Sequence, residues 1–191
     1  MTIINTVLIT FVTLSFIGTI LYQFAYRFTT HYLVARRGFS LGNVGSFIFI
    51  HEDWNHFFGN MLLFIPSYYL NSWLFDQNCV MLLFLISLGT LGAWIAAMIK
   101  IHCCRYKECF GLSGVAFFMF ANGMTVLASR DYHSWLTAIA IIVMVIFIGV
   151  LYVEDIKGRR IGRWTIAHML CAIEGIISGI ILGQLLWQSQ K

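Results

Sequence analysis

Six apolar stretches divide the chain, and the segments between them hold most of its charged residues. Each stretch is about 20 residues long, the length that an α-helix needs to cross the hydrocarbon core of a bilayer. The pattern predicts membrane-spanning helices over residues 2–24, 54–75, 79–98, 111–128, 134–153 and 164–187. The second and the sixth of these also carry polar residues, which are costly in a membrane-spanning helix.

The connection between the first two predicted helices, residues 25–53, is long and still apolar in many places. We expect it to rest in the membrane interface, where aromatic side chains are favoured, and not in water. The first apolar stretch follows no Lys or Arg and precedes no small-residue cleavage site, so we interpret it as a helix and not as a signal peptide.

Composition supports a membrane protein. Of the 191 residues, 60% are hydrophobic and only 10% are charged, whereas a soluble domain has about 25% charged residues. Six spans use up most of the length, so we predict one all-α membrane domain over residues 1–191. The net charge of +4 does not indicate nucleic-acid binding, because the basic residues lie in short segments between apolar stretches.

The five cysteines form no paired framework. Cys103, Cys104 and Cys109 share one predicted loop, where a disulfide or an adventitious metal is one alternative and free thiols are the other.

The distribution of basic residues predicts an orientation. The first, third and fifth predicted loops carry ten of the twelve, namely Arg27, Arg36, Arg37, Lys100, Arg105, Lys107, Lys157, Arg159, Arg160 and Arg163. Arg130 and Lys191 lie on the other side. The positive-inside rule would place the odd loops in the cytoplasm.

Strongly polar side chains inside a membrane helix are costly and therefore point to function. His51 and His56 are too far apart for the His-Glu-x-x-His zinc motif, which needs histidines four residues apart, so no metal site is expected there. His56 and Asn60 do have that spacing and project from one helix face. Their N–H groups suit a transient oxyanion, although a polar pair that holds two helices together is the alternative.

Two further sites lie near the starts of predicted helices. Ser113, between Gly111 and Gly114, is placed beside unpaired backbone N–H groups, although a simple helix cap is the alternative. His168 begins a stripe of small residues that recurs every four positions, at Cys171, Gly175, Gly179 and Gly183. Such a stripe lets another helix backbone approach closely.

The second, fourth and sixth predicted helices all follow odd-numbered loops, so they begin on the same side of the membrane. Ser113 and His168 therefore lie at similar depth, where a neutral imidazole can activate a hydroxyl. Glu174 is about 240° around the helix from His168 and faces elsewhere. We predict a dyad without a carboxylate.

Together, His56-x-x-x-Asn60, Gly111-x-Ser113-Gly114 and Ala167-His168 resemble the rhomboid family of intramembrane serine proteases. His51 resembles a further family histidine, and Cys171 stands where the family has glycine. The resemblance implies a rhomboid-like bundle in which Ser113 is the nucleophile and His168 the base. It further implies that His56, Asn60 and the Ser113 N–H form an oxyanion hole.

By that resemblance, the protein cleaves transmembrane protein substrates that arrive from the lipid bilayer, without a metal or other cofactor. It would be a multi-pass protein of the cell (inner) membrane, in contact with membrane lipids. The family orientation puts the site opposite the cytoplasm, against the charge distribution. A non-catalytic protein that binds membrane helices and a small transporter are the alternatives.

Overall fold

The structure is a computed structural model that describes residues 2–36, 45–103, 108–109, 111–130, 142 and 165–189. Helices dominate these residues: α1 (Ile3–Phe24), α2 (Tyr26–Tyr32), the 3₁₀ turn η2 (Phe47–Phe49), α3 (Trp54–Leu74), α4 (Cys79–Cys103), α5 (Ser113–Arg130) and α7 (Thr165–Ser189). Within the same ranges, strand structure is limited to the antiparallel pair β1 (Ala35–Arg36) and β2 (Glu108–Cys109). The predicted all-α fold class is confirmed.

Five of the six predicted helices are found close to their predicted bounds, and the fifth, residues 134–153, lies outside the described residues. One boundary was wrong. α4 continues to Cys103, so Lys100 and His102 belong to its last turn and not to a loop. The physical reason is that positive groups are favourable at a helix C-terminus, where the dipole is negative, so a lysine does not mark the end of a helix.

Three described helices are long and apolar enough to cross a membrane: Ile3–Phe24, Cys79–His102 and Ala167–Leu186. The apolar helix Ser113–Ser129 is shorter than these three and is close to the minimum of about 17 residues that a span needs. α3 has the length but also carries buried polar side chains, at Asn60, Ser67, Asn71 and Ser72. Their burial keeps these four polar side chains away from the outer surface, so they face the inside of the bundle.

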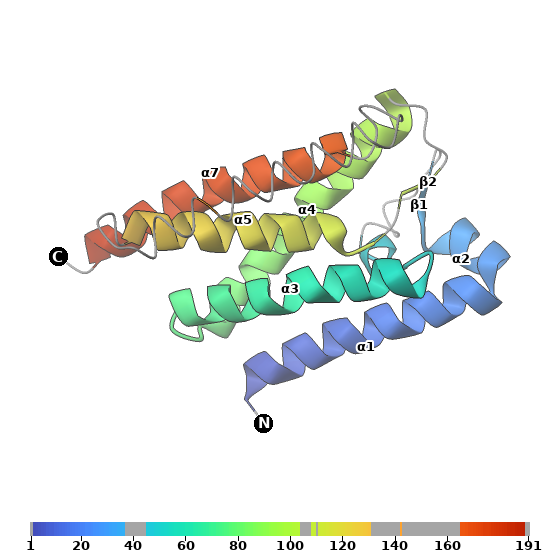
Figure 1. Cartoon of the computed structure of the whole chain (residues 1–191), viewed down its shortest axis with the longest axis horizontal. Coiled ribbons are helices and arrows are strands. Elements are labelled where there is room, and N and C mark those ends of the chain that lie inside the picture. Colours follow the sequence, from blue (N-terminus) through green and yellow to red (C-terminus); the bar gives the residue numbers. More distant parts are fainter. Residues whose placement is uncertain are drawn as a thin grey trace.

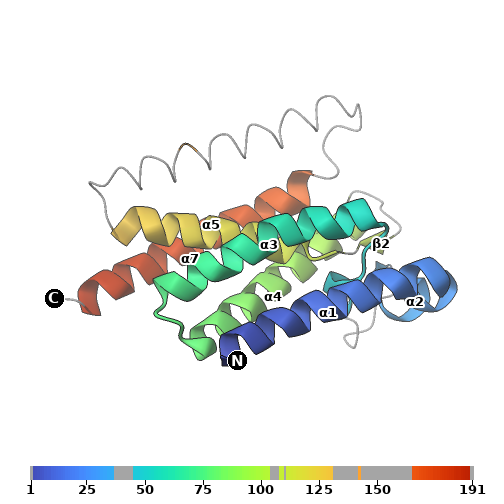
Figure 2. The same ribbon diagram turned by 60° about the horizontal axis from the view of Figure 1, so that its bottom comes forward.

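The helices pack so that α3, α5 and α7 start at one end of the molecule, the end at which α1 and α4 finish (Figure 1). α3 lies between α1 and α5, α5 packs most extensively against α7, and α4 crosses both α5 and α7 obliquely (Figure 2). The starts of the three helices that carry the candidate residues therefore share one end, as the loop count predicted.

Small residues bring α5 and α7 together. A Cβ on Gly175 would collide with the carbonyl oxygen of Phe118, and one on Gly179 would lie 2.7 Å from the Cβ of Thr125. Gly183 faces Ser129 in the same way, at 2.7 Å. The predicted stripe on α7 thus packs directly against the backbone of α5, and this contact sets how far apart the two helices are.

Gly175→Ala is expected to destabilise the protein by about 1–3 kcal/mol, because the added methyl group would have to push the α5 backbone away. Gly59→Ala is the matched control, since a Cβ there meets nothing within 4 Å. We expect that variant to be unchanged or slightly more stable, as alanine favours helix. Unfolding by a denaturing detergent measures both, and equal stability of the two variants would contradict the packing.

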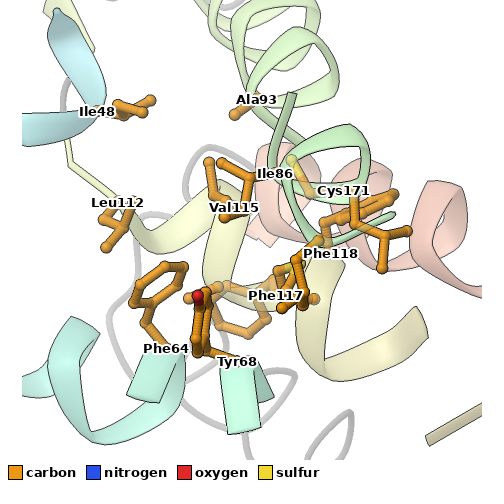
Figure 3. Close-up of a cluster of buried hydrophobic side chains, with 14 of the residues drawn as sticks. Ile48, Phe64, Tyr68, Ile86, Ala93, Leu112, Val115, Phe117, Phe118 and Cys171 are labelled. Carbon is orange, nitrogen blue, oxygen red and sulfur yellow. The ribbon is translucent and has the colours of Figure 1, made fainter. Parts of the chain in front are cut away.

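Buried side chains of η2, α3, α4, α5 and α7 meet around the first turns of α5 (Figure 3). Phe64 and Tyr68 come from α3, Ala93 from α4 and Cys171 from α7, and all four are buried. The first turn of α5 is therefore fixed from several sides, which gives Ser113 a rigid support.

Candidate active site

Ser113 and His168 meet at the shared end of the bundle. The Nε2 atom of His168 lies 3.0 Å from the Oγ atom of Ser113, within hydrogen-bond distance. The His168 ring also stacks on Phe117, with ring centroids 4.6 Å apart and planes inclined by 26°. Phe117 is one helical turn beyond Ser113, so a single face of α5 both holds the imidazole and presents the hydroxyl to it.

The turn before Ser113 needs a glycine. Gly111 has φ +105°, a backbone conformation that side chains other than glycine rarely adopt. Its N–H donates to the carbonyl oxygen of Phe47 at 2.9 Å, which ties the turn to η2. Leu112 accepts the first helical hydrogen bond, from the N–H of Ala116 at 2.9 Å. Ser113 thus opens α5, where backbone N–H groups have no helical acceptor.

His56 and Asn60 converge on this turn from α3. A Cβ on Gly111 would lie 2.9 Å from Nε2 of His56 and 3.4 Å from Nδ2 of Asn60. The missing side chain of Gly111 therefore leaves room in front of both nitrogen atoms. The Asn60 Nδ2 atom is buried and has no hydrogen-bond acceptor among the described residues. A preorganised donor of this kind can stabilise a negative charge that forms only during a reaction.

Two other asparagines show what a structural amide looks like in this bundle. Asn71 Nδ2 donates to the carbonyl oxygens of Ser67 and Met119, both at 2.8 Å, and so links α3 to α5. Asn122 Nδ2 donates to Oγ of Ser178 at 2.7 Å and links α5 to α7. Because Nδ2 of Asn60 makes no such bond, holding helices together does not account for it.

His51 supports the turn from outside the helices. Its side chain is fully buried, with Nδ1 placed 3.2 Å from the carbonyl oxygen of Phe49 and Nε2 accepting the N–H of Leu112 at 3.5 Å. The rings of His51 and His56 contact edge to face, with centroids 5.2 Å apart. His51 therefore positions the backbone directly before Ser113 and supports the neighbouring imidazole.

Burial, followed by the nearby charge of His56, lowers the pKa of His51 from 6.5 to about 4. The neutral form is thus favoured in the folded protein, and the stability it contributes is present above pH 6.5. We expect that contribution, at most about 3 kcal/mol, to be lost as the pH falls from 6.5 towards 4. Thermal unfolding across this pH range measures it.

His51→Gln is the matched variant, because its amide oxygen can accept the Leu112 N–H without titrating. Its stability should change less between pH 6.5 and 4 than that of the unaltered protein. Parallel pH curves for the two proteins would refute the assignment to His51.

Cys171 fits beside the site without disturbing it. Its side chain is buried, and its Sγ atom lies 3.2 Å from where a Cβ on Gly114 would be. The absence of a side chain at Gly114 therefore leaves room for the sulfur atom.

Glu174 points away from the site, towards α4. Its carboxylate occupies the space where a side chain at Gly92 would lie. It lies on a different side of α7 from the face that meets Ser113.

Sequence reasoning missed two residues at this site. Phe117 follows Ser113 by four positions, a spacing that could have identified it as sharing the Ser113 face. Lys100 was assigned to a loop, yet it lies in the last turn of α4 and its side chain is only 8% exposed. Nothing in the local sequence pattern distinguishes Lys100 from the lysines of the predicted loops.

The described residues contain no group of three or more His, Cys, Asp or Glu side chains placed to hold a metal ion. The side chains of Cys103, Cys104 and Cys109 lie outside the described residues, so both alternatives for them stay open. No protein-family model matches the chain, and no curated protein matches its sequence.

Proposed function

We propose that the protein is a rhomboid-type intramembrane serine endopeptidase that hydrolyses peptide bonds in or near transmembrane segments. The observation that carries this proposal is the 3.0 Å contact between Oγ of Ser113 and Nε2 of His168. The buried amide of Asn60 beside Gly111 supports it, because a hydroxyl, a base and an oxyanion donor are what acyl transfer requires.

In the first half of the reaction, His168 Nε2 takes the proton of the Ser113 hydroxyl while Oγ bonds to the substrate carbonyl carbon. The carbonyl π electrons move to oxygen, and the resulting oxyanion accepts hydrogen bonds from the N–H groups of Asn60, His56 and the Ser113 backbone. When the C–N bond breaks, its electron pair goes to nitrogen, which takes the proton from His168. The amine product leaves and an acyl ester remains on Ser113.

In the second half, a water molecule gives a proton to His168 and bonds to the ester carbon. The C–O bond to Ser113 then breaks, Ser113 regains its proton from His168, and the carboxyl product is released. No carboxylate assists His168 in this scheme. Stacking on Phe117 takes over the task of orienting the ring, which a third catalytic member performs elsewhere.

The three apolar helices that are long enough to span a bilayer support a membrane location. We place the chain in the cell membrane as a six-span, multi-pass bundle in contact with lipid, with residues 134–153 as the fifth span. We count α3 and α5 as spans as well, because most of their strongly polar side chains are buried inside the bundle, namely Asn60, Ser67, Asn71, Ser72, Asn122 and Thr125. Substrates in this proposal are membrane proteins whose helices approach laterally through the lipid and unwind at the site.

The test is cleavage in reconstituted liposomes. A single-span substrate with helix-breaking residues near one end of its span should be cut at one bond, which mass spectrometry of the fragments locates. A substrate with the same span made of leucine should be cut much more slowly, because a stable helix does not present its carbonyl groups. Binding of both substrates with no fragments from either would instead favour a non-catalytic protein that binds membrane helices.

A further inference from the structure

Gly18 of α1 packs directly against the peptide group that ends η2. A Cβ at this position would collide with the carbonyl oxygen of Phe49 and would lie 2.8 Å from its carbonyl carbon. α1 provides none of the residues placed at the candidate site, and Gly18 lies in its buried face. The contact is nevertheless the first in a series that leads to the site.

His51 is the second member of this series. Its Nδ1 atom lies 3.2 Å from the same carbonyl oxygen of Phe49, while its Nε2 atom accepts the N–H of Leu112 at 3.5 Å. A neutral imidazole carries one proton, on one of its two nitrogen atoms. Because Nε2 accepts, the proton is on Nδ1, which donates to Phe49. The carbonyl oxygen that Gly18 admits therefore orients the ring and selects its tautomer.

The turn before Ser113 is attached to this segment twice. Gly111 donates its N–H to the carbonyl oxygen of Phe47 at 2.9 Å, and Leu112 donates its own to His51. Both acceptor residues are buried and belong to η2 or to the two residues after it. A shift of this segment would move both attachments together, and with them the backbone N–H of Ser113.

α1 is attached on both sides of Gly18. Near the start of the helix, the Ile4 carbonyl oxygen accepts the buried hydroxyl of Tyr68 of α3 at 2.7 Å. Near its end, Gln23 Nε2 donates to the carbonyl oxygen of Glu52 at 2.7 Å. Because these two bonds hold the helix in place, we expect a side chain at position 18 to displace the peptide group of η2 and not α1.

We infer that Gly18 is a positioning residue for the proposed hydrolysis. It acts through Phe49 and His51 on the turn that carries the N–H of Ser113. This inference rests on the proposed protease function, in which that N–H is one of the oxyanion donors. A donor of this kind lowers the barrier only when it is aimed at the developing charge before the reaction begins. The absence of a side chain on α1 thus helps to preorganise the site.

Gly18→Ala in the full chain, reconstituted in liposomes, tests the inference. We expect kcat per folded molecule to fall by about 10- to 100-fold with KM within about 3-fold, the effect of a displacement of about 1 Å at a catalytic group. Gly183→Ala is the matched control. A Cβ there would lie 2.7 Å from that of Ser129, about 22 Å beyond His168 along α7. That variant should lose stability but keep its kcat, and a purely structural role of Gly18 predicts the same for Gly18→Ala.

Two further measurements follow the series through His51. In a His51→Ala background, Gly18→Ala should lower kcat by less than about 3-fold, because the series is already broken there. Nitrogen-15 NMR of labelled histidines in detergent should show the His51 proton on Nδ1 at neutral pH, and Gly18→Ala should give a mixture of both tautomers. His51→Gln assigns the signal. The NMR measurement needs no substrate cleavage.

A kcat for Gly18→Ala within about 3-fold of that of the control would overturn the inference, as would losses that multiply in the double variant. A His51 proton on Nε2 in the unaltered protein would overturn it as well, and this tautomer decides in either direction if Gly18→Ala does not fold. A protein that cleaves no substrate but keeps the proton on Nδ1 is a different result, because it removes the protease function and leaves the contacts intact.

Discussion

Ser113→Ala and His168→Ala are each expected to lower the rate of substrate cleavage by about 10⁴-fold or more. The first variant removes the attacking oxygen, and the second removes the acceptor of its proton, 3.0 Å away. The double variant should be no slower than either single one, because the two groups act as a unit. Fragment yield over time in liposomes measures all three.

Both variants should remain folded, since each replacement removes a half-buried side chain and fills no space. Their unfolding transitions in detergent serve as the control. Residual cleavage within about 10-fold of the original rate in either variant would exclude the assigned dyad, and losses that add in the double variant would exclude a shared step.

Asn60→Ala is expected to lower kcat by about 10²–10³-fold, the usual effect of removing one oxyanion donor. Its stability should change little, because the Nδ2 atom has no hydrogen-bond partner to lose among the described residues. Asn71→Ala, on the same helix, should behave in the opposite way. It breaks buried hydrogen bonds to Ser67 and Met119, so we expect a loss of about 1–3 kcal/mol with kcat nearly unchanged.

The pair of asparagine variants separates catalysis from structure within one helix. Steady-state cleavage gives kcat, and detergent-induced unfolding gives stability. If Asn60→Ala lost stability and not kcat, Asn60 would be a helix-packing residue and the oxyanion would need other donors.

Much of the fold followed from the lengths of the apolar stretches and the spacing of small residues. Apolar stretches of the right length predicted α1, α3, α4, α5 and α7, and small residues every four positions predicted the face on which α7 meets α5. The approach of Ser113 to His168 followed from counting loops, because helices that enter from one side place their first turns at one depth. These inferences needed only local pattern and chain direction.

The remaining features depend on tertiary contacts that a single sequence does not reveal. The end of α4 was predicted too early, because a lysine is equally common in a loop and in the last turn of a helix, where it is favourable. The bond from Leu112 to His51 joins residues 61 positions apart. The room for the Cys171 sulfur comes from Gly114 on another helix. Each is decided by which helices become neighbours.

The most direct test of the central claim is the reactivity of Ser113 towards a fluorophosphonate probe in the intact membrane. Such probes bond to a serine only when a neighbouring base activates it. We predict that peptide mapping finds the label on Ser113, that His168→Ala abolishes it and that Asn71→Ala retains it. An unlabelled Ser113 in the folded protein, or labelling that persists without His168, would contradict an activated serine at this site.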